Sequence, residues 1–165
     1  MQQLASPRHR QEAKQRLRFS GADPLAAVRQ GLKHPKAVVR QMCVNILDRL
    51  VDLDSLPDLV AALDDEDVDV RARALHALAC DACKQNECRP DDELFVPRAI
   101  ELLGHHPDAD LRAAAVDALG KAAGRRPDAV AALTTAADHD PHRGIRNMAR
   151  IRLRRLPRRA AREGA

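Results

Sequence analysis

The sequence predicts an all-α protein, an α-solenoid of about four two-helix repeats with one cysteine-containing insertion. Apolar residues recur at helical spacing between short breaks that contain Pro or acidic residues. One residue pattern returns four times along the chain, at the spacing typical of helical repeats. The 165 residues include two Phe and no Tyr or Trp. A core of Ala, Leu and Val suits closely packed helices better than a β-sandwich, which draws on aromatic and β-branched residues.

The predicted repeat domain covers residues 21–156, between a basic, flexible or partly helical segment at 1–20 and a basic tail at 157–165. Its first helix follows Asp23, which can cap a helix with Pro24 in the first turn. The break at 34–35 separates this helix from a second one. The apolar residues of the second helix are Val38, Val39, Val44, Leu47, Leu50 and Val51.

Three further helix pairs are predicted along the chain, beginning near residues 55, 91 and 127. The second helices of these pairs begin at Asp67, Asp108 and about His142, and the first of them is expected to run to Ala82. The apolar positions that define these pairs include Leu59, Leu63, Val70, Leu75, Leu78, Leu94, Ile100, Leu103, Leu111, Val116, Leu119 and Leu133.

An Arg stands at the same place in every predicted second helix, and the second of the three intervals between them is the longest. A small residue follows each Arg after three positions, and a Leu follows after seven. The aligned Arg residues are Arg40, Arg71, Arg112 and Arg146. A period of this length with two helices in each repeat indicates an α-solenoid.

The segments DEDVDVRARALHAL and HPDADLRAAAVDALG resemble the HEAT-repeat family, especially the short HEAT repeats first noted in phycobilisome lyases. The resemblance covers roughly residues 23–156 and implies a right-handed, armadillo-type solenoid. It also implies that the four aligned Arg residues form a structural ladder of hydrogen bonds. The fourth repeat departs from the pattern, because Arg150 stands where the other repeats have an apolar residue. That departure suits a polar C-terminal cap.

The long interval between Arg71 and Arg112 indicates an insertion of about ten residues between Cys80 and Pro90. Around it the sequence reads H-x3-C-x2-C-x4-C, and the first three of these residues would share one arc of a helix. Three thiolates and one imidazole match a closed structural zinc site. The predicted ligands are His76, Cys80, Cys83 and Cys88, and Lys84 and Arg89 are expected to offset the negative charge of the site.

Two other states of these cysteines remain open: a disulfide from Cys88 to Cys80 or Cys83, and simple burial as thiols. A Cys80–Cys83 disulfide is disfavoured, because helical residues three apart hold their Cβ atoms ~5–6 Å apart whereas a disulfide requires ~3.5–4.5 Å. Redox catalysis is disfavoured because the C-x2-C lies at a helix C-terminus, where the helix dipole destabilises a thiolate. Cys43 is excluded because it occupies the small-residue position of its repeat.

No catalytic motif is present: the sequence has no Gly-rich phosphate loop, G-x-S-x-G or H-E-x-x-H. Three histidines, His105, His106 and His142, stand between predicted helices, where a turn or cap role is favoured over a second metal site. The sequence therefore favours a non-enzymatic scaffold that binds a protein partner. An assembly role like that of bilin lyase subunits rests on the repeat type alone.

Charge suggests an alternative function. The net charge is +4, but residues 143–165 hold nine Arg and one Glu, whereas residues 21–142 hold 14 basic and 22 acidic residues. A stripe on the predicted last helix can contact nucleic-acid phosphates, and consists of Arg143, Arg146, Arg150 and Arg154.

No apolar run reaches the ~18 residues of a membrane span, and the N-terminal residues contain no apolar signal region. We therefore expect a cytoplasmic protein without a membrane partner. In the cytoplasm, clustered cysteines indicate a metal rather than a disulfide.

Overall fold

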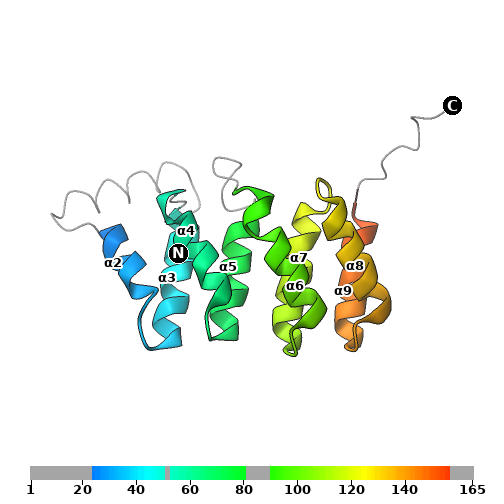
Figure 1. Ribbon diagram of the computed structural model, residues 1–165, viewed down its shortest axis with the longest axis horizontal. Coiled ribbons are helices and arrows are strands. Elements are labelled where there is room, and N and C mark those ends of the chain that lie inside the picture. The colour runs from blue at the N-terminus through cyan, green and yellow to red at the C-terminus, as the bar shows by residue number, and fades with distance from the viewer. Residues whose placement is uncertain (1–23, 51–52, 81–89, 157–165) are drawn as a thin grey trace. The chain divides into compact units, whose positions relative to one another are not determined.

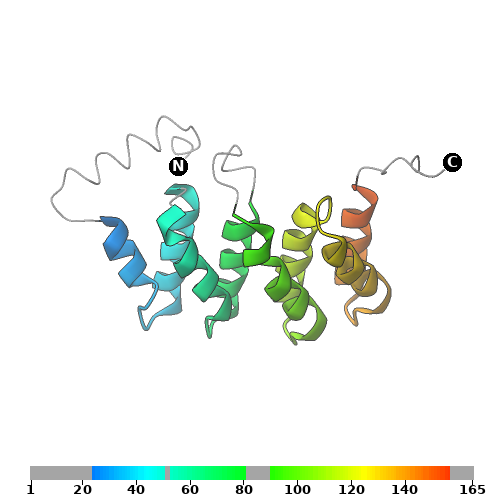
Figure 2. The ribbon, with the colours of Figure 1, turned by 45° about the horizontal axis from the view of Figure 1, so that its top comes forward.

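The computed structural model describes residues 24–50, 53–80 and 90–156. The chain divides into two compact units, Met1–Phe95 and Val96–Ala165, and each unit is considered by itself. Every regular element in the described residues is a helix (Figures 1 and 2). The all-α class predicted from apolar periodicity is confirmed.

The first unit contains two helix pairs. The first pair is α2 (Pro24–Gly31) and α3 (Ala37–Leu50), and the second is α4 (Leu56–Ala61) and α5 (Val68–Ala79). Short 3-10 turns flank α4, and a third turn follows at Asp92–Leu94. Helix α3 packs against both α2 and α5, and α4 packs against α5.

Local sequence explains where these helices begin. The carboxylate of Asp67 accepts hydrogen bonds from the backbone amides of Asp69 and Val70 at the start of α5. The bond from Val70 contributes most to lowering the pKa of Asp67. The fully buried large side chains of the unit come from both pairs and from the last turn: Val44, Leu47, Leu63, Val70, Leu75, Leu78 and Phe95.

The second unit also contains two pairs. They are α6 (Val96–His105) with α7 (Ala109–Ala122), and α8 (Pro127–His139) with α9 (Arg143–Arg154). Helix α7 packs against α6, α8 and α9. Asp108 caps α7 by accepting from the amide of Leu111, as its sequence position predicts.

Helices α7 and α9 approach each other closely at Gly120. A Cβ atom at this glycine would lie only 2.6 to 3.2 Å from three carbons of the Arg152 side chain. The guanidinium of Arg152 pairs with Asp117, one turn earlier on α7. The small residue therefore leaves room for an arginine stem, which packs across the helix pair.

Three details differ from the sequence prediction. Helix α5 ends at Ala79 rather than Ala82, because Cys80 has an extended ψ of 111°. The apolar pattern did not reveal this end, since Ala82 continues it. Leu94 is expected on the apolar face of the first helix of the third pair, but it lies in a 3-10 turn before α6 and is 37% exposed. Val38 is 57% exposed rather than part of the core.

Among the described helices, none combines the length and hydropathy that a bilayer span requires.

Candidate functional site

Arg40 joins the two repeats of the first unit. Its Nε and Nη2 atoms each donate to the carboxylate of Asp65 at 2.8 Å, and Nη2 also reaches Glu66 at 3.0 Å. Its Nη1 atom donates to the carbonyl oxygens of His34 and Pro35, in the turn before α3. The hydrogen bonds to Asp65 are the main reason that the pKa of Arg40 is raised. All three nitrogens of this buried guanidinium are thus engaged in structural bonds.

Arg112 repeats this arrangement in the second unit. Its Nε and Nη2 atoms donate to Asp140 at 2.8 and 3.1 Å, and its Nη1 atom donates to the carbonyls of His106 and Pro107, both at 2.9 Å. The two charged side chains are 8% and 3% exposed. A cation that is buried and bonded in this way fixes the spacing of two repeats and is unavailable to a ligand.

The other two aligned arginines occupy the same position on α5 and α9. Arg146 donates from Nη1 to the carbonyl oxygens of Asp140 and Pro141, at 2.6 and 3.1 Å. Arg71 is half-buried on α5. One geometry is shared by three of the aligned arginines: Nη1 donates to the carbonyl oxygens of the residues six and five positions earlier, in the turn before the helix. The three are Arg40, Arg112 and Arg146. This shared role explains why Arg recurs at this position.

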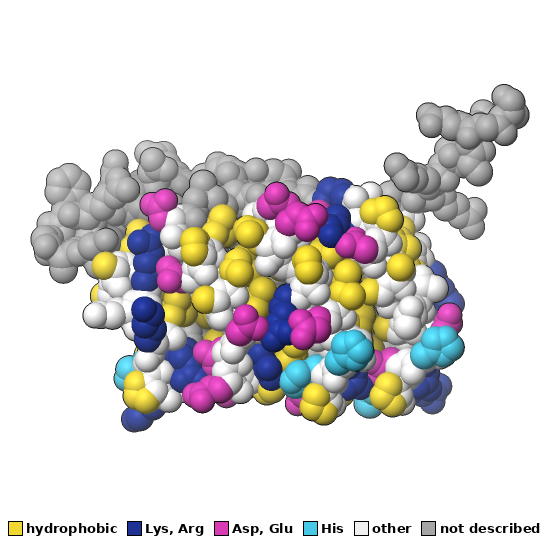
Figure 3. Space-filling model, in the orientation of Figure 1, with side chains coloured by type: hydrophobic (Ala, Val, Ile, Leu, Met, Phe, Trp, Pro, Cys, Tyr) yellow, Lys and Arg dark blue, Asp and Glu magenta, His cyan; other side chains and the backbone are white. Residues whose placement is uncertain are grey.

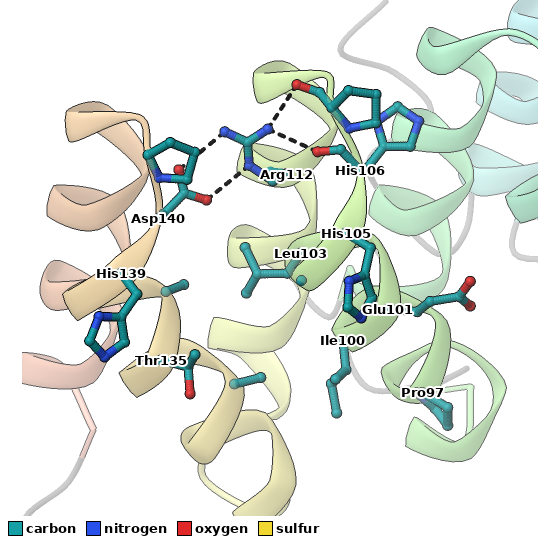
Figure 4. A pocket seen from close by; sticks show the side chains of 15 residues that line it. Pro97, Ile100, Glu101, Leu103, His105, His106, Arg112, Thr135, His139 and Asp140 are labelled. Carbon is teal, nitrogen blue, oxygen red and sulfur yellow. Dashed lines mark hydrogen bonds and ion pairs between the residues drawn. The ribbon is translucent and has the colours of Figure 1, made fainter.

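A groove lies between α6 and α8 in the second unit, with a volume of ≈ 820 Å³. Its inner surface is apolar and includes Ile100, Leu103, Ala132 and Ala136. Figure 4 shows its remaining walls, with His105 and Glu101 on α6 and His139 and Thr135 on α8. The Arg112–Asp140 pair closes one end.

The rim of this groove is polar and accessible to solvent. Glu101, His105, Thr135 and His139 are all exposed, whereas Leu103 and Ala136 are buried. Histidine side chains gather over α6 and α8 in Figure 3. Glu101 pairs with Arg98 on its own helix, and this hydrogen bond is the largest cause that lowers the pKa of Glu101. An apolar floor inside a polar rim is the usual composition of a protein docking site.

Sequence reasoning placed His105 in a turn and missed both His139 and Thr135. The structure places His105 and His139 at the last positions of α6 and α8. The interval between these two histidines equals the interval between Arg112 and Arg146. Extending the repeat alignment to the first helices would therefore have paired them.

The other two histidines of the inter-helix breaks take part in turns. His106 accepts a hydrogen bond at Nδ1 from the amide of Asp108, at 3.1 Å. His142 precedes α9 as its N-cap residue, and its amide donates to Asp140 at 2.8 Å. These contacts give both residues the turn and cap roles that their positions favoured.

The arginine stripe on α9 is smaller than the sequence suggested. Arg143, Arg150 and Arg154 are exposed on one face of the helix. Within the described ranges, none of these three makes an ion pair or side-chain hydrogen bond. Arg146, the fourth predicted member, is held by backbone carbonyls instead. The stripe available to a partner therefore consists of three arginines.

The predicted zinc ligands lie only partly within the described residues. His76 is exposed on α5, and Cys80, the residue that follows the helix, is 4% exposed and a free thiol. The other ligands, Cys83 and Cys88, lie outside the described residues, as do Lys84 and Arg89. Across 24–50, 53–80 and 90–156, no three His, Cys, Asp or Glu side chains are grouped to hold a metal. A site would therefore need both undescribed cysteines.

Paired helices joined by repeated arginine bonds define this chain as an α-helical repeat protein. The family model for HEAT repeats matches residues 1–79 and 87–154, and the chain belongs to that family. Its fold is accordingly of the α-solenoid class. Proteins built from HEAT repeats generally mediate protein–protein interactions as scaffolds. A search of curated proteins found no match to this sequence.

Proposed function

We propose that the protein is a non-enzymatic scaffold that binds a protein partner in the groove between α6 and α8. The observation that supports this proposal is the groove itself, which combines a volume of ≈ 820 Å³ with apolar walls contributed by two repeats. A groove between neighbouring helices accommodates the apolar face of a short peptide segment.

The side chains around the groove indicate the chemistry of the partner segment. Ile100 and Leu103 offer contact area to aliphatic side chains, while Thr135 and the two rim histidines offer hydrogen-bonding groups. The charge of Glu101 is offset by Arg98 on the same helix. We therefore infer a segment whose apolar side chains enter the groove and whose polar groups contact His105 and His139.

Substituting Thr135 by Arg should block the groove without disturbing the core, because Thr135 is exposed on α8 and lines the groove. We expect at least a tenfold loss of partner recovery, which corresponds to about 1.4 kcal/mol of binding free energy. Affinity purification followed by quantitative mass spectrometry measures the recovery.

The matched control is Thr134→Arg. Thr134 is also exposed, makes the same kind of hydrogen bond to the carbonyl four residues earlier, and does not line the groove. Partners that bind in the groove are retained by this variant and lost by Thr135→Arg. Equal recovery by both variants and the unsubstituted protein would contradict the proposal.

A second candidate function is binding of nucleic-acid phosphates through α9. It is favoured by the exposed arginines Arg143, Arg150 and Arg154, which share one helix face and have no partner within the described part of the chain. Base recognition is not expected, because single-strand binders stack bases on aromatic rings and the chain has only two Phe.

Salt dependence tests this second candidate. Three phosphate contacts predict that log K for duplex DNA falls with log salt with a slope of about −2.7. Arg150→Gln should reduce the steepness of that slope by about 0.9. Arg49→Gln changes the net charge equally but removes an exposed arginine of α3, so it serves as the control. Absence of binding at low salt, or equal slopes for the two variants, would exclude the stripe.

We also propose a structural zinc ion held by His76, Cys80, Cys83 and Cys88. The support is the donor set, three thiolates and an imidazole, together with a free Cys80 thiol at the C-cap of α5, four residues after His76. Bound zinc would attach the insertion to the end of α5. Elemental analysis of the purified protein is the direct measurement, and about one zinc per chain is the expected result.

A further inference from the structure

An apolar stripe lies open on α3. Val38, Met42 and Ile46 are 57%, 59% and 39% exposed, and their spacing of four residues places them along one face of the helix. They are three of the five large hydrophobic side chains that are exposed in the described residues. Single exposed apolar residues are ordinary, but a continuous stripe indicates a surface that another element covers.

Contacts on α3 show which way the stripe faces. Gln41 donates to Asp67 at the start of α5, and Asn45 accepts from Arg73 on α5. These contacts mark the flank of α3 that meets the following repeat. Met42 and Ile46 follow Gln41 and Asn45 by one residue each, which turns them about 100° around the helix, away from that flank.

The equivalent flank of α5 and of α9 contacts the second helix that precedes each of them in its own unit. Ala77 on α5 is the counterpart of Ile46, and it is fully buried. Arg73, the counterpart of Met42, donates to Asn45 on α3. On α9 the counterpart of Ile46 is Arg152, which pairs with Asp117 on α7. This flank of a second helix is thus the one that receives the preceding repeat.

Residues 1–23 are the chain that precedes α2, and their sequence contains the second-helix pattern once more. The three pattern residues of this segment are Arg10, Ala13 and Leu17. Each stands the same number of residues before its counterpart on α3, which is Arg40, Cys43 or Leu47. This spacing is close to the spacing between the aligned residues Arg40 and Arg71. As residue types, Ser6 and Pro7 suit the cap and first turn of a helix, and Gly21 suits a helix end. The match to HEAT repeats also begins at residue 1.

We propose that residues 7–20 form an additional second helix that docks on the stripe of Val38, Met42 and Ile46. Gln11 and Gln15 take the positions of Gln41 and Asn45, the flank that faces the next helix. Their aliphatic stems, with that of Arg18, cover the stripe. Lys14 stands at the position of Arg150 in the fourth repeat, which also has a basic residue there.

Hydrogen exchange of the full-length chain tests this docking. Met42→Glu introduces a charge into the stripe at an exposed position, so α3 itself retains its core contacts. We expect amides of residues 10–20 to exchange at least tenfold faster in this variant than in the unsubstituted protein. Ile151→Glu, at another exposed hydrophobic position on α9, is the matched control and should leave their exchange unchanged.

A reciprocal measurement changes the segment instead of the stripe. Leu17→Glu should accelerate peroxide oxidation of Met42 severalfold, because a docked segment shields its sulfur, while Met148 on α9 serves as an internal reference. Unchanged exchange in Met42→Glu together with unchanged Met42 oxidation in Leu17→Glu would overturn the proposal. A dimer that Met42→Glu dissociates, with residues 10–20 unaffected, would also overturn it and assign the stripe to a second copy of the chain.

Discussion

Replacing Arg112 by Met should lower the free energy of unfolding by about 3–5 kcal/mol, the usual cost of removing one partner from a buried ion pair. Methionine keeps much of the side-chain volume but provides no donor. The Asp140 carboxylate, only 3% exposed, loses two hydrogen bonds, and the carbonyls of His106 and Pro107 lose theirs. Urea unfolding followed by circular dichroism measures the loss.

Two further variants separate the ion pair from a general effect of lost charge. Arg143→Met removes an exposed arginine at the start of α9 and should change stability by less than about 0.5 kcal/mol. Combining Arg112→Met with Asp140→Leu removes both charges and should recover part of the loss. A single Arg112→Met variant as stable as the unsubstituted protein would show that the pair does not hold the repeats together.

The loss of unfolding free energy in Arg112→Met should depend on pH, because Asp140 can be protonated. Burial acts to raise the pKa of Asp140, but the hydrogen bonds from Arg112 and from the His142 amide outweigh it and lower the pKa below the usual range. A folded-state pKa below the unfolded value of about 3.9 stabilises the protein above that pH. The difference in stability between the unsubstituted protein and Arg112→Met should therefore be full at neutral pH and shrink as pH falls, because protonation of Asp140 removes the ion pair of the former and the unpaired buried charge of the latter.

Removing the proposed zinc should have a larger effect still, because structural zinc contributes on the order of 10 kcal/mol to folding. We expect Cys83→Ser to bind no zinc and to melt at least about 10 °C lower than the unsubstituted protein. Calorimetry with and without a chelator, paired with elemental analysis, gives both quantities. The chelator should lower the melting temperature of the unsubstituted protein but not that of Cys83→Ser.

Cys43→Ala is the control for thiol loss. Cys43 is buried on α3 and takes the position that Ala74, Ala115 and Ala149 take in the other repeats, so this variant should keep its zinc. If Cys83→Ser and the unsubstituted protein have the same metal content and melting temperature, the zinc site is absent.

The helices were predictable because their signals are local. The caps Asp67 and Asp108 and the proline at Pro127 mark the starts of α5, α7 and α8, and the structure begins these helices there. The end of α5 was predicted wrongly, because Ala82 continues the apolar pattern whereas the backbone at Cys80 is already extended. Half of the predicted zinc ligands lie beyond that point and outside the described residues.

The sequence by itself determined the order of the helices and the register of the repeats, because helical periodicity and caps act over a few residues. Only the tertiary structure decided which side chains are withdrawn from the surface and which remain available. It paired Arg112 with Asp140 at the C-terminal end of α8, held Arg146 on backbone carbonyls, and brought His105 and His139 to the rim of one groove. It left Met42 exposed where its counterpart Arg73 contacts α3. These outcomes depend on how one repeat packs against the next, since equivalent residues have different neighbours inside an array and at its ends.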